Sequence, residues 1–199
     1  MSTADQPATD RAMMRRCIEL SASAGAGGEL PFACVICDGD RVVAETVNCV
    51  RRERDVTRHA ELVAISLAQK ALGRKNLARC TLYANVEPCP MCSFPIRETR
   101  MRRVVYAIGS PAMGGVSKWN ILRDTELSKM MPEAFGPVPE IVAGLMGREA
   151  EQVWRKSHPL VWAIIQHRGC FAPVADTCHR MQAIPQPQGW LRSLLTLHR

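Results

Sequence analysis

Two cysteines in the stretch VEPCPMC have a spacing that suits metal binding. Cys89 and Cys92 are three residues apart, and Pro90 between them fits the first turn of a helix, where its missing N–H would have no partner anyway. Residues three apart lie on one face of a helix, and the positive end of the helix dipole favours thiolates. Two thiolates alone do not hold a metal ion, because a structural zinc site needs four protein ligands and an open catalytic site needs three.

A second Cys-x-x-Cys motif runs from Cys34 to Cys37 and provides a contrast. It falls in a short apolar run that predicts a strand, where residues three apart point to opposite faces. These two thiols therefore cannot bind one metal ion, and we expect them to be core residues.

The missing ligand must be a histidine or a carboxylate. Four of the five histidines fall in the C-terminal quarter, and only His59 precedes the cysteine pair. Glu61 follows two residues later, where a carboxylate is either a solvated first-turn residue or a general base held near a metal. His-x-Glu followed by Pro-Cys-x-x-Cys is the signature of zinc deaminases that act on nucleobases. We therefore predict that His59, Cys89 and Cys92 bind Zn²⁺ and that Glu61 is the general base.

The elements that must position these residues alternate along the chain. The hydrophobic patterning predicts helices over 10–24, 55–72, 89–100, about 119–130 and 148–167, and strands over 31–37, 41–46, 81–86, 104–108 and 141–145. Asp55 or Thr57 is the expected N-cap of the second helix, and Pro159 is expected to kink the last one. This alternation predicts an α/β sheet with helices on both faces.

In these segments the chain resembles the cytidine deaminase superfamily, above all the branch that holds tRNA adenosine deaminases, guanine deaminases and cytosine deaminases. The resemblance covers about residues 11–167 and rests, in order, on PFACVICDGDRVVAETVN, DVTRHAE, LYANVEPCPMC and MRRVVYAIGSP. It implies a three-layer α/β/α fold with a five-stranded mixed sheet, assembled as a homodimer or larger homo-oligomer. It also implies that Asn48 and the backbone N–H of Ala60 contact the substrate, although an asparagine there also suits a turn.

The predicted reaction is the hydrolytic removal of an exocyclic amine from a nucleobase or nucleoside of the cytosine, adenine or guanine type. A zinc-activated water attacks the ring carbon, Glu61 passes the proton to the leaving amine, and ammonia departs. The loop GSPAMGGVSKWN contains no acidic residue, which counts against a guanine pocket built on carboxylates there. Phe94 and Pro95 are expected to reshape the pocket wall. Phe32 and Trp119 are candidate residues for stacking on the substrate, but each is interpreted as a core residue rather than a pocket residue.

The charge leaves a second substrate class open. The net charge is +7, with 21 arginines against five lysines, but these charges are scattered and only 5% of the residues are aromatic. Deamination of adenosine to inosine in tRNA is therefore the alternative to a free base or nucleoside. A noncatalytic zinc- or RNA-binding protein would have no use for Glu61, and a redox dithiol protein would not need His59.

The chain is expected to consist of a zinc-dependent deaminase domain, residues 1–170, and a C-terminal extension, residues 171–199. The extension carries an apolar stripe that we expect to dock on the domain or on a partner subunit; it consists of Trp190, Leu191, Leu194 and Leu195. No apolar run approaches the length of a membrane span, and the N-terminus lacks the apolar segment of a secretory signal. Nine cysteines spread through hydrophobic segments suit a reducing compartment, so a cytoplasmic location is expected.

Overall fold

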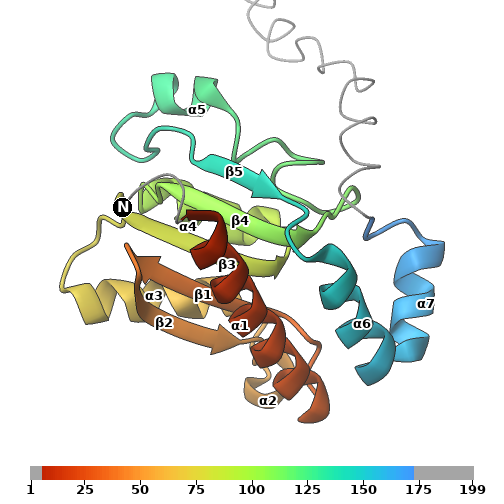
Figure 1. Ribbon diagram of the computed structural model, residues 1–199. Helices are drawn as coiled ribbons and strands as arrows, with labels where there is room; N and C mark the ends of the chain where they lie inside the picture. The colour runs from red at the N-terminus through yellow and green to blue at the C-terminus, as the bar shows by residue number, and fades with distance from the viewer. Residues whose placement is uncertain (1–5, 173–199) are drawn as a thin grey trace, which may run out of the picture.

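The computed structural model describes residues 6–172, in which helices and strands alternate after a long first helix (Figure 1). The apolar stripe predicted to dock lies outside the described residues. The helices are α1 (Gln6–Ala26), α2 (Val50–Glu53), α3 (Ala60–Leu72), α4 (Pro90–Glu98), α5 (Thr125–Met130), α6 (Gly147–Ser157) and α7 (Pro159–His167). The strands are β1 (Ala33–Asp38), β2 (Arg41–Val47), β3 (Cys80–Val86), β4 (Arg103–Ile108) and β5 (Glu140–Ala143).

The five strands form one mixed sheet in the order β2-β1-β3-β4-β5. Strand β1 is antiparallel to both β2 and β3, whereas β3, β4 and β5 run parallel to one another. The β1–β2 hairpin turns at Gly39, whose φ of 63° lies in the left-handed region that glycine adopts without a steric penalty. The predicted five-stranded mixed sheet is confirmed.

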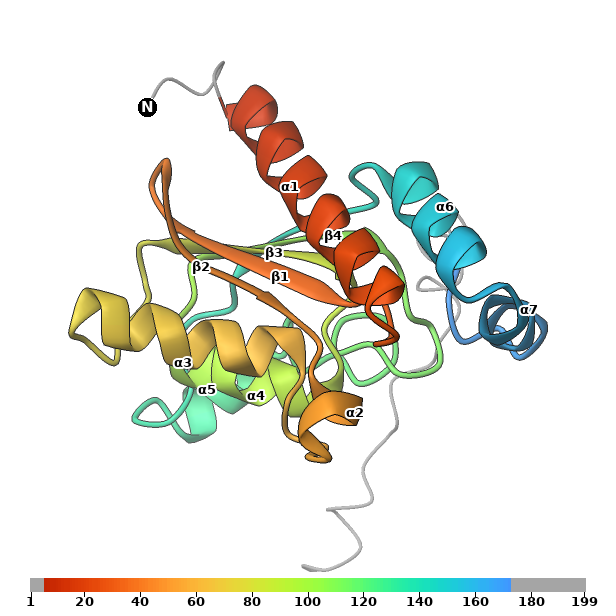
Figure 2. The same ribbon diagram turned by 90° about the horizontal axis from the view of Figure 1, so that it is seen from below.

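Helices cover both faces of the sheet (Figure 2). Helices α1 and α6 lie on one face and α3 and α4 on the other, so the chain has the predicted three-layer α/β/α architecture. Two buried apolar clusters fill the spaces between the layers, and β1 contributes to both. Its Cys34 belongs to the cluster beneath α3, whereas Cys37 belongs to the cluster beneath α1, as expected for residues three apart in a strand.

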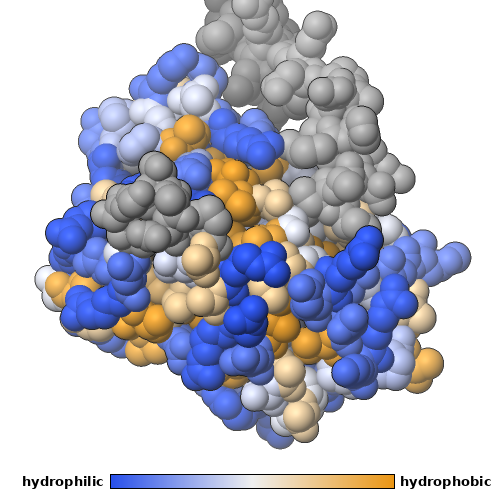
Figure 3. Space-filling model, in the orientation of Figure 1, coloured by the Kyte–Doolittle hydropathy of each residue, from blue (hydrophilic) through white to orange (hydrophobic). Residues whose placement is uncertain are grey.

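The face that carries α1 and α6 is largely hydrophilic, with hydrophobic residues showing between the charged ones (Figure 3). None of the helices in the described part of the chain is long and apolar enough to cross a membrane.

Two predicted helix starts were wrong. Helix α3 begins at Ala60 rather than near Asp55, because the Asp55 carboxylate accepts hydrogen bonds from the backbone N–H and the hydroxyl of Thr57 and so closes a turn before the helix. Helix α5 begins at Thr125 rather than near Trp119. Its N-cap is Asp124, whose side chain accepts from two backbone N–H groups of the first turn.

The predicted kink at Pro159 is a complete break. Helix α6 ends at Ser157 and α7 begins at Pro159, with His158 between them in a non-helical conformation at φ −140° and ψ 64°. Proline disfavours the helical conformation in the residue before it, which explains why the break falls at His158.

Candidate active site

Two of the predicted metal ligands occupy the N-cap positions of two helices on the same face of the sheet. His59 is the N-cap of α3 and Cys89 is the N-cap of α4, and neither side chain forms a capping hydrogen bond. Both residues have extended backbones, with Pro90 at the start of α4 as predicted. The hydroxyl of Thr46 on β2 donates to the Ala60 carbonyl at 2.7 Å, which ties the start of α3 to the sheet.

The three donor atoms form a nearly equilateral triangle. The distance from His59 Nδ1 to each thiol sulfur is 3.5 Å, and the sulfurs of Cys89 and Cys92 are 3.6 Å apart. Tetrahedral zinc with Zn–S bonds of about 2.3 Å separates two sulfurs by roughly 3.8 Å, so the triangle fits zinc and leaves a fourth position free of protein ligands. Within residues 6–172, these three residues are the group of side chains that satisfies the geometry of a metal site.

The electrostatics of the pair also favour a thiolate. The hydrogen bond between Cys89 and Cys92 lowers the pKa of Cys89 to about 4, against the opposing effect of burial and with help from His59. The same hydrogen bond raises the pKa of Cys92, and the contact with Cys89 raises that of His59. Thiolate is the form of cysteine that binds metals, so the site provides the required charge.

Glu61 is buried beside the triangle but is not one of its three members. The pKa of the Glu61 carboxyl is raised to about 7, chiefly by burial; the charge of Cys89 acts in the same direction, and a backbone hydrogen bond and the charge of His59 oppose it. A carboxyl group with a pKa near neutrality both takes up and releases a proton readily, which is the property required of a general acid–base group.

A cavity of about 130 Å³ opens next to the three donor atoms. The predicted substrate contacts Asn48 and Ala60 both line it, together with His59, Glu61 and Cys89. Ala60 is the first residue of α3, so its backbone N–H has no partner within the helix. The structure thus places every sequence-predicted site residue except the fully buried Cys92 on the wall of one cavity, with Cys92 directly behind Cys89.

Glu87, at the end of β3, shapes the cavity in a way that the sequence did not reveal. Its buried carboxylate accepts hydrogen bonds from the backbone N–H groups of Ser110, Val116 and Ser117 at 2.7–2.8 Å, and also from the Ser117 hydroxyl. A Cβ atom at Gly114 would collide with this carboxylate, so the loop after β4 needs a glycine there. The carboxylate that organises this loop therefore comes from Glu87 and not from the loop itself.

Three other wall residues were also missed as cavity residues. Phe32, Met113 and Phe171 line the apolar side of the cavity. Phe32 and Phe171 also pack edge-on against Trp154 in the core, so Phe32 is a core residue as predicted but a wall residue as well. The only sequence signal was the position of Phe32 just before a strand, and Phe171 lies beyond the range of the motifs.

Two expectations about aromatic residues were not met. Phe94 does not line the cavity; it is 43% exposed and its ring packs against Phe135 at 5.6 Å. Trp119, predicted to be a core residue, is 58% exposed. Phe94 lies on α4 and Trp119 in the loop between β4 and α5, and neither lines the cavity.

The sequence and structure match known deaminases. The family model for the cytidine and deoxycytidylate deaminase zinc-binding region matches residues 7–108. A probable cytosine deaminase of Schizosaccharomyces pombe is 35% identical over 136 residues, which cover 68% of this chain and 77% of the relative. A tRNA(Ile)-lysidine synthase of Deinococcus deserti is 34% identical over 148 residues. This match covers 72% of this chain but only 26% of that protein.

Among solved structures, a tRNA:A34 deaminase from a study of A-to-I editing at the wobble position superposes with a TM-score of 0.64. It is 31% identical, and the match covers 71% of this chain and 98% of that one. The chain belongs to the cytidine and deoxycytidylate deaminase family, and residues 7–108 carry the zinc-binding region of that family.

Proposed function

We propose that this chain is a zinc-dependent hydrolytic deaminase that removes the exocyclic amine of a free nucleobase or nucleoside. The observation that carries the proposal is the triangle of His59, Cys89 and Cys92 at one cavity with a buried carboxyl group, Glu61, outside the ligand set. A purely structural zinc site would use four protein ligands and no general base.

In the proposed mechanism, His59, Cys89 and Cys92 hold the metal. Zinc bound there would supply a water molecule of lowered pKa for attack on the ring carbon that carries the amine. Glu61 takes up the proton of that water and delivers it to the leaving amine, so that ammonia departs and an oxygen replaces the nitrogen. Asn48 and the Ala60 backbone N–H hold the ring in position.

The cavity supports a small, uncharged substrate. Its volume of about 130 Å³ is below the ~300–1,000 Å³ that is typical of pockets for drug-sized ligands, and suits a single ring system. Its wall combines Phe32, Met113 and Phe171 with few polar groups, and among residues 6–172 no lysine or arginine lines it. A phosphorylated substrate would need a cationic partner that this described part of the wall does not offer.

Ammonia release from the purified enzyme tests the proposal across cytosine, adenine, guanine, their nucleosides and a tRNA anticodon stem-loop. We expect turnover of at least one free base or nucleoside, and none in a Glu61→Gln variant that retains zinc. Turnover of the stem-loop alone would overturn the small-molecule assignment, and turnover of nothing in the panel would overturn the proposed function.

Deamination of adenosine in tRNA is the second candidate, supported by the similarity to the tRNA:A34 deaminase and by the arginines near the cavity. Two of the arginines between Asn48 and His59 have partners within the chain: Arg51 donates to the Gly28 carbonyl, and Arg58 pairs with Glu53 and Asp55. Contacts to several phosphates would make activity fall steeply with salt, with a log–log slope of roughly 0.7–0.9 per neutralised phosphate. We expect a nearly flat dependence on salt between 50 and 200 mM, the range over which such losses are marked.

A cytoplasmic location and assembly as a homodimer or larger homo-oligomer complete the proposal. Thiolate ligands are best preserved in a reducing compartment, which supports the location. The resemblance to oligomeric deaminases supports the assembly. Light scattering on the purified protein tests the oligomeric state, and fractionation of cells tests the location.

A further inference from the structure

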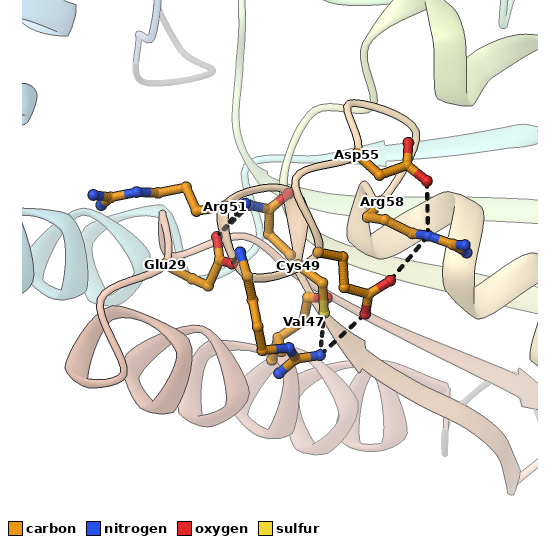
Figure 4. Close-up of polar contacts among 9 residues, drawn as sticks. Glu29, Val47, Cys49, Arg51, Asp55 and Arg58 are labelled. Carbon is orange, nitrogen blue, oxygen red and sulfur yellow. Dashed lines mark hydrogen bonds and ion pairs between the residues drawn. The ribbon is translucent and has the colours of Figure 1, made fainter.

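Glu29, in the segment between α1 and β1, is a buried carboxylate that the proposed mechanism does not use. It is 7% exposed, and it accepts hydrogen bonds from Asn48 Nδ2 at 3.1 Å and from the backbone N–H groups of Arg51 and Arg52 at 3.3 and 2.6 Å. Figure 4 shows it reaching from its own segment to the short helix α2 that follows β2. One carboxylate therefore connects the region after α1 to the residues next to the cavity.

The position of Glu29 is fixed independently of these contacts. Its backbone carbonyl accepts a hydrogen bond from His158 Nε2 at 2.8 Å, at the junction of α6 and α7. Its backbone N–H donates to the Ala24 carbonyl in the last turn of α1. The Asn48 backbone N–H in turn donates to the Phe32 carbonyl at 2.9 Å. Because both main chains are held, the contact between the two side chains has a defined geometry.

The chemistry of Glu29 determines which way the Asn48 amide faces. An ionised carboxylate only accepts hydrogen bonds, and an asparagine side chain has one donor group and one acceptor oxygen. The NH₂ group of Asn48 must therefore face Glu29. The carbonyl oxygen Oδ1 is then the atom left for the cavity, which Asn48 lines.

We propose that Glu29 is a positioning residue that holds the Asn48 amide with Oδ1 towards the cavity, so that Asn48 accepts a hydrogen bond from a donor group of the substrate. This inference rests on the proposed function, because it takes Asn48 as a substrate contact. Suitable donors are the N1–H of cytosine, the N9–H of adenine or guanine, and a ribose hydroxyl of a nucleoside. A ring nitrogen that carries only a lone pair is not recognised there.

The first test needs no substrate and uses the zinc-loaded enzyme. We expect the side-chain NH₂ protons of Asn48 to exchange slowly with solvent in NMR spectra, and to exchange faster with a shifted resonance in Glu29→Gln. The matched control is Glu53→Gln, which removes a carboxylate from α2 next to Arg51 and Arg52, but one that pairs with Arg52 and Arg58 instead of Asn48. An Asn48 signal that does not respond to Glu29→Gln, or responds equally to Glu53→Gln, would overturn the proposal.

The second test is kinetic and uses the member of the ammonia-release panel that the wild type deaminates fastest. In Glu29→Gln a donor replaces one acceptor oxygen, so the Asn48 amide is no longer held in one orientation. The contact is present in both the ground state and the transition state, so we expect KM to rise about tenfold or more while kcat changes little. An unchanged KM in Glu29→Gln, or an equal rise in Glu53→Gln, would contradict the positioning role.

A double variant provides the rescue experiment. Asn48→Asp alone places two carboxylates against each other, whereas Glu29→Gln together with Asn48→Asp lets the glutamine NH₂ donate to the aspartate and leaves an acceptor oxygen at the cavity. We expect the double variant to have a KM several-fold lower than that of Asn48→Asp. A double variant no better than Asn48→Asp would contradict the proposal. If the wild type deaminates nothing in the panel, the proposed function fails, while the NMR result still decides whether Glu29 holds Asn48.

Discussion

The chain contains two Cys-x-x-Cys motifs that have the same spacing and different structural environments. Cys34 and Cys37 lie on β1, with no exposed surface, in two apolar clusters on opposite faces of the sheet. Cys89 and Cys92 lie at the start of α4, with their sulfurs 3.6 Å apart and both 3.5 Å from His59 Nδ1. The comparison shows that spacing makes a chelating pair only when the secondary structure brings both side chains to one side.

The two motifs differ as much in electrostatics as in geometry. Burial raises the pKa of Cys37 to about 12, so that thiol stays protonated at neutral pH. Hydrogen bonding within the second motif lowers the pKa of Cys89 to about 4, so that thiol is ionised. The first pair contributes apolar volume to the core and the second contributes charge to the cavity.

Removing one sulfur at a time should distinguish the two motifs most clearly, by zinc content. We expect about one zinc per chain in the wild type and nearly none in Cys89→Ala or Cys92→Ala, because two ligands do not hold the ion. Cys34→Ala and Cys37→Ala should keep their zinc. Elemental analysis of the four purified variants measures this, and full zinc in both helix variants would show that the metal binds elsewhere.

A substitution at Glu61 should abolish catalysis without affecting zinc binding, because Glu61 lies beside the three ligands but is not one of them. Glu61→Gln keeps the shape of the side chain but removes the proton carrier, so we expect kcat to fall by about 10²–10⁴-fold with zinc content unchanged. The comparison uses kcat and zinc measured on the same preparations. A variant that retains a tenth of the wild-type kcat would remove Glu61 from its assigned role.

Alkylation at pH 7 should separate the two motifs by reactivity. After a chelator removes zinc, we expect iodoacetamide to modify Cys89 well before Cys34 or Cys37, because thiolate is the nucleophile and burial keeps the strand thiols both protonated and shielded. Peptide mapping by mass spectrometry at successive times follows each site. Equal rates for the two motifs would show that the sheet opens as readily as the metal site.

The smallest expected effect is on stability. Cys37→Ser places a hydroxyl group among apolar side chains beneath α1, and an uncompensated buried hydroxyl costs about 1–3 kcal/mol. Urea unfolding of the zinc-loaded enzyme measures the loss, with Cys37→Ala as the control for the missing sulfur. A serine variant as stable as the alanine variant would mean that the hydroxyl finds a hydrogen-bond partner in the core.

The sequence predicted the parts of the site that lie within short motifs. The spacing in VEPCPMC and the pair His59 and Glu61 led to the donor triangle because each half sits at the start of a helix, where local rules apply. The alternation of apolar runs led to an α/β sheet with helices on both faces, and the resemblance to the cytidine deaminase superfamily implied that the sheet is mixed and five-stranded. Helix starts near Asp55 and Trp119 were misplaced because a local turn and a separate N-cap compete with helix formation.

What the sequence could not show depends on contacts between distant segments. Glu29 and Asn48 are 19 residues apart, and Glu87 reaches 23 to 30 residues along the chain to the loop after β4. Glu29 belongs to none of the motifs, and Glu87, although it lies in VEPCPMC, gives no local sign of the loop that it organises. Phe171 meets the cavity only because the segment after α7 returns to β4, where Gly109 and Ala172 form an isolated bridge.

The apolar wall of the cavity is unevenly tolerant of mutation, which matters for how this enzyme could acquire new specificities. Phe32 and Phe171 pack against Trp154, so a smaller residue at either position would reduce stability along with any change in the cavity. Met113 lies on the same wall but is 48% exposed and belongs to neither apolar cluster. A library of variants for altered base preference should therefore begin at Met113, where the shape of the cavity can change at little cost in stability.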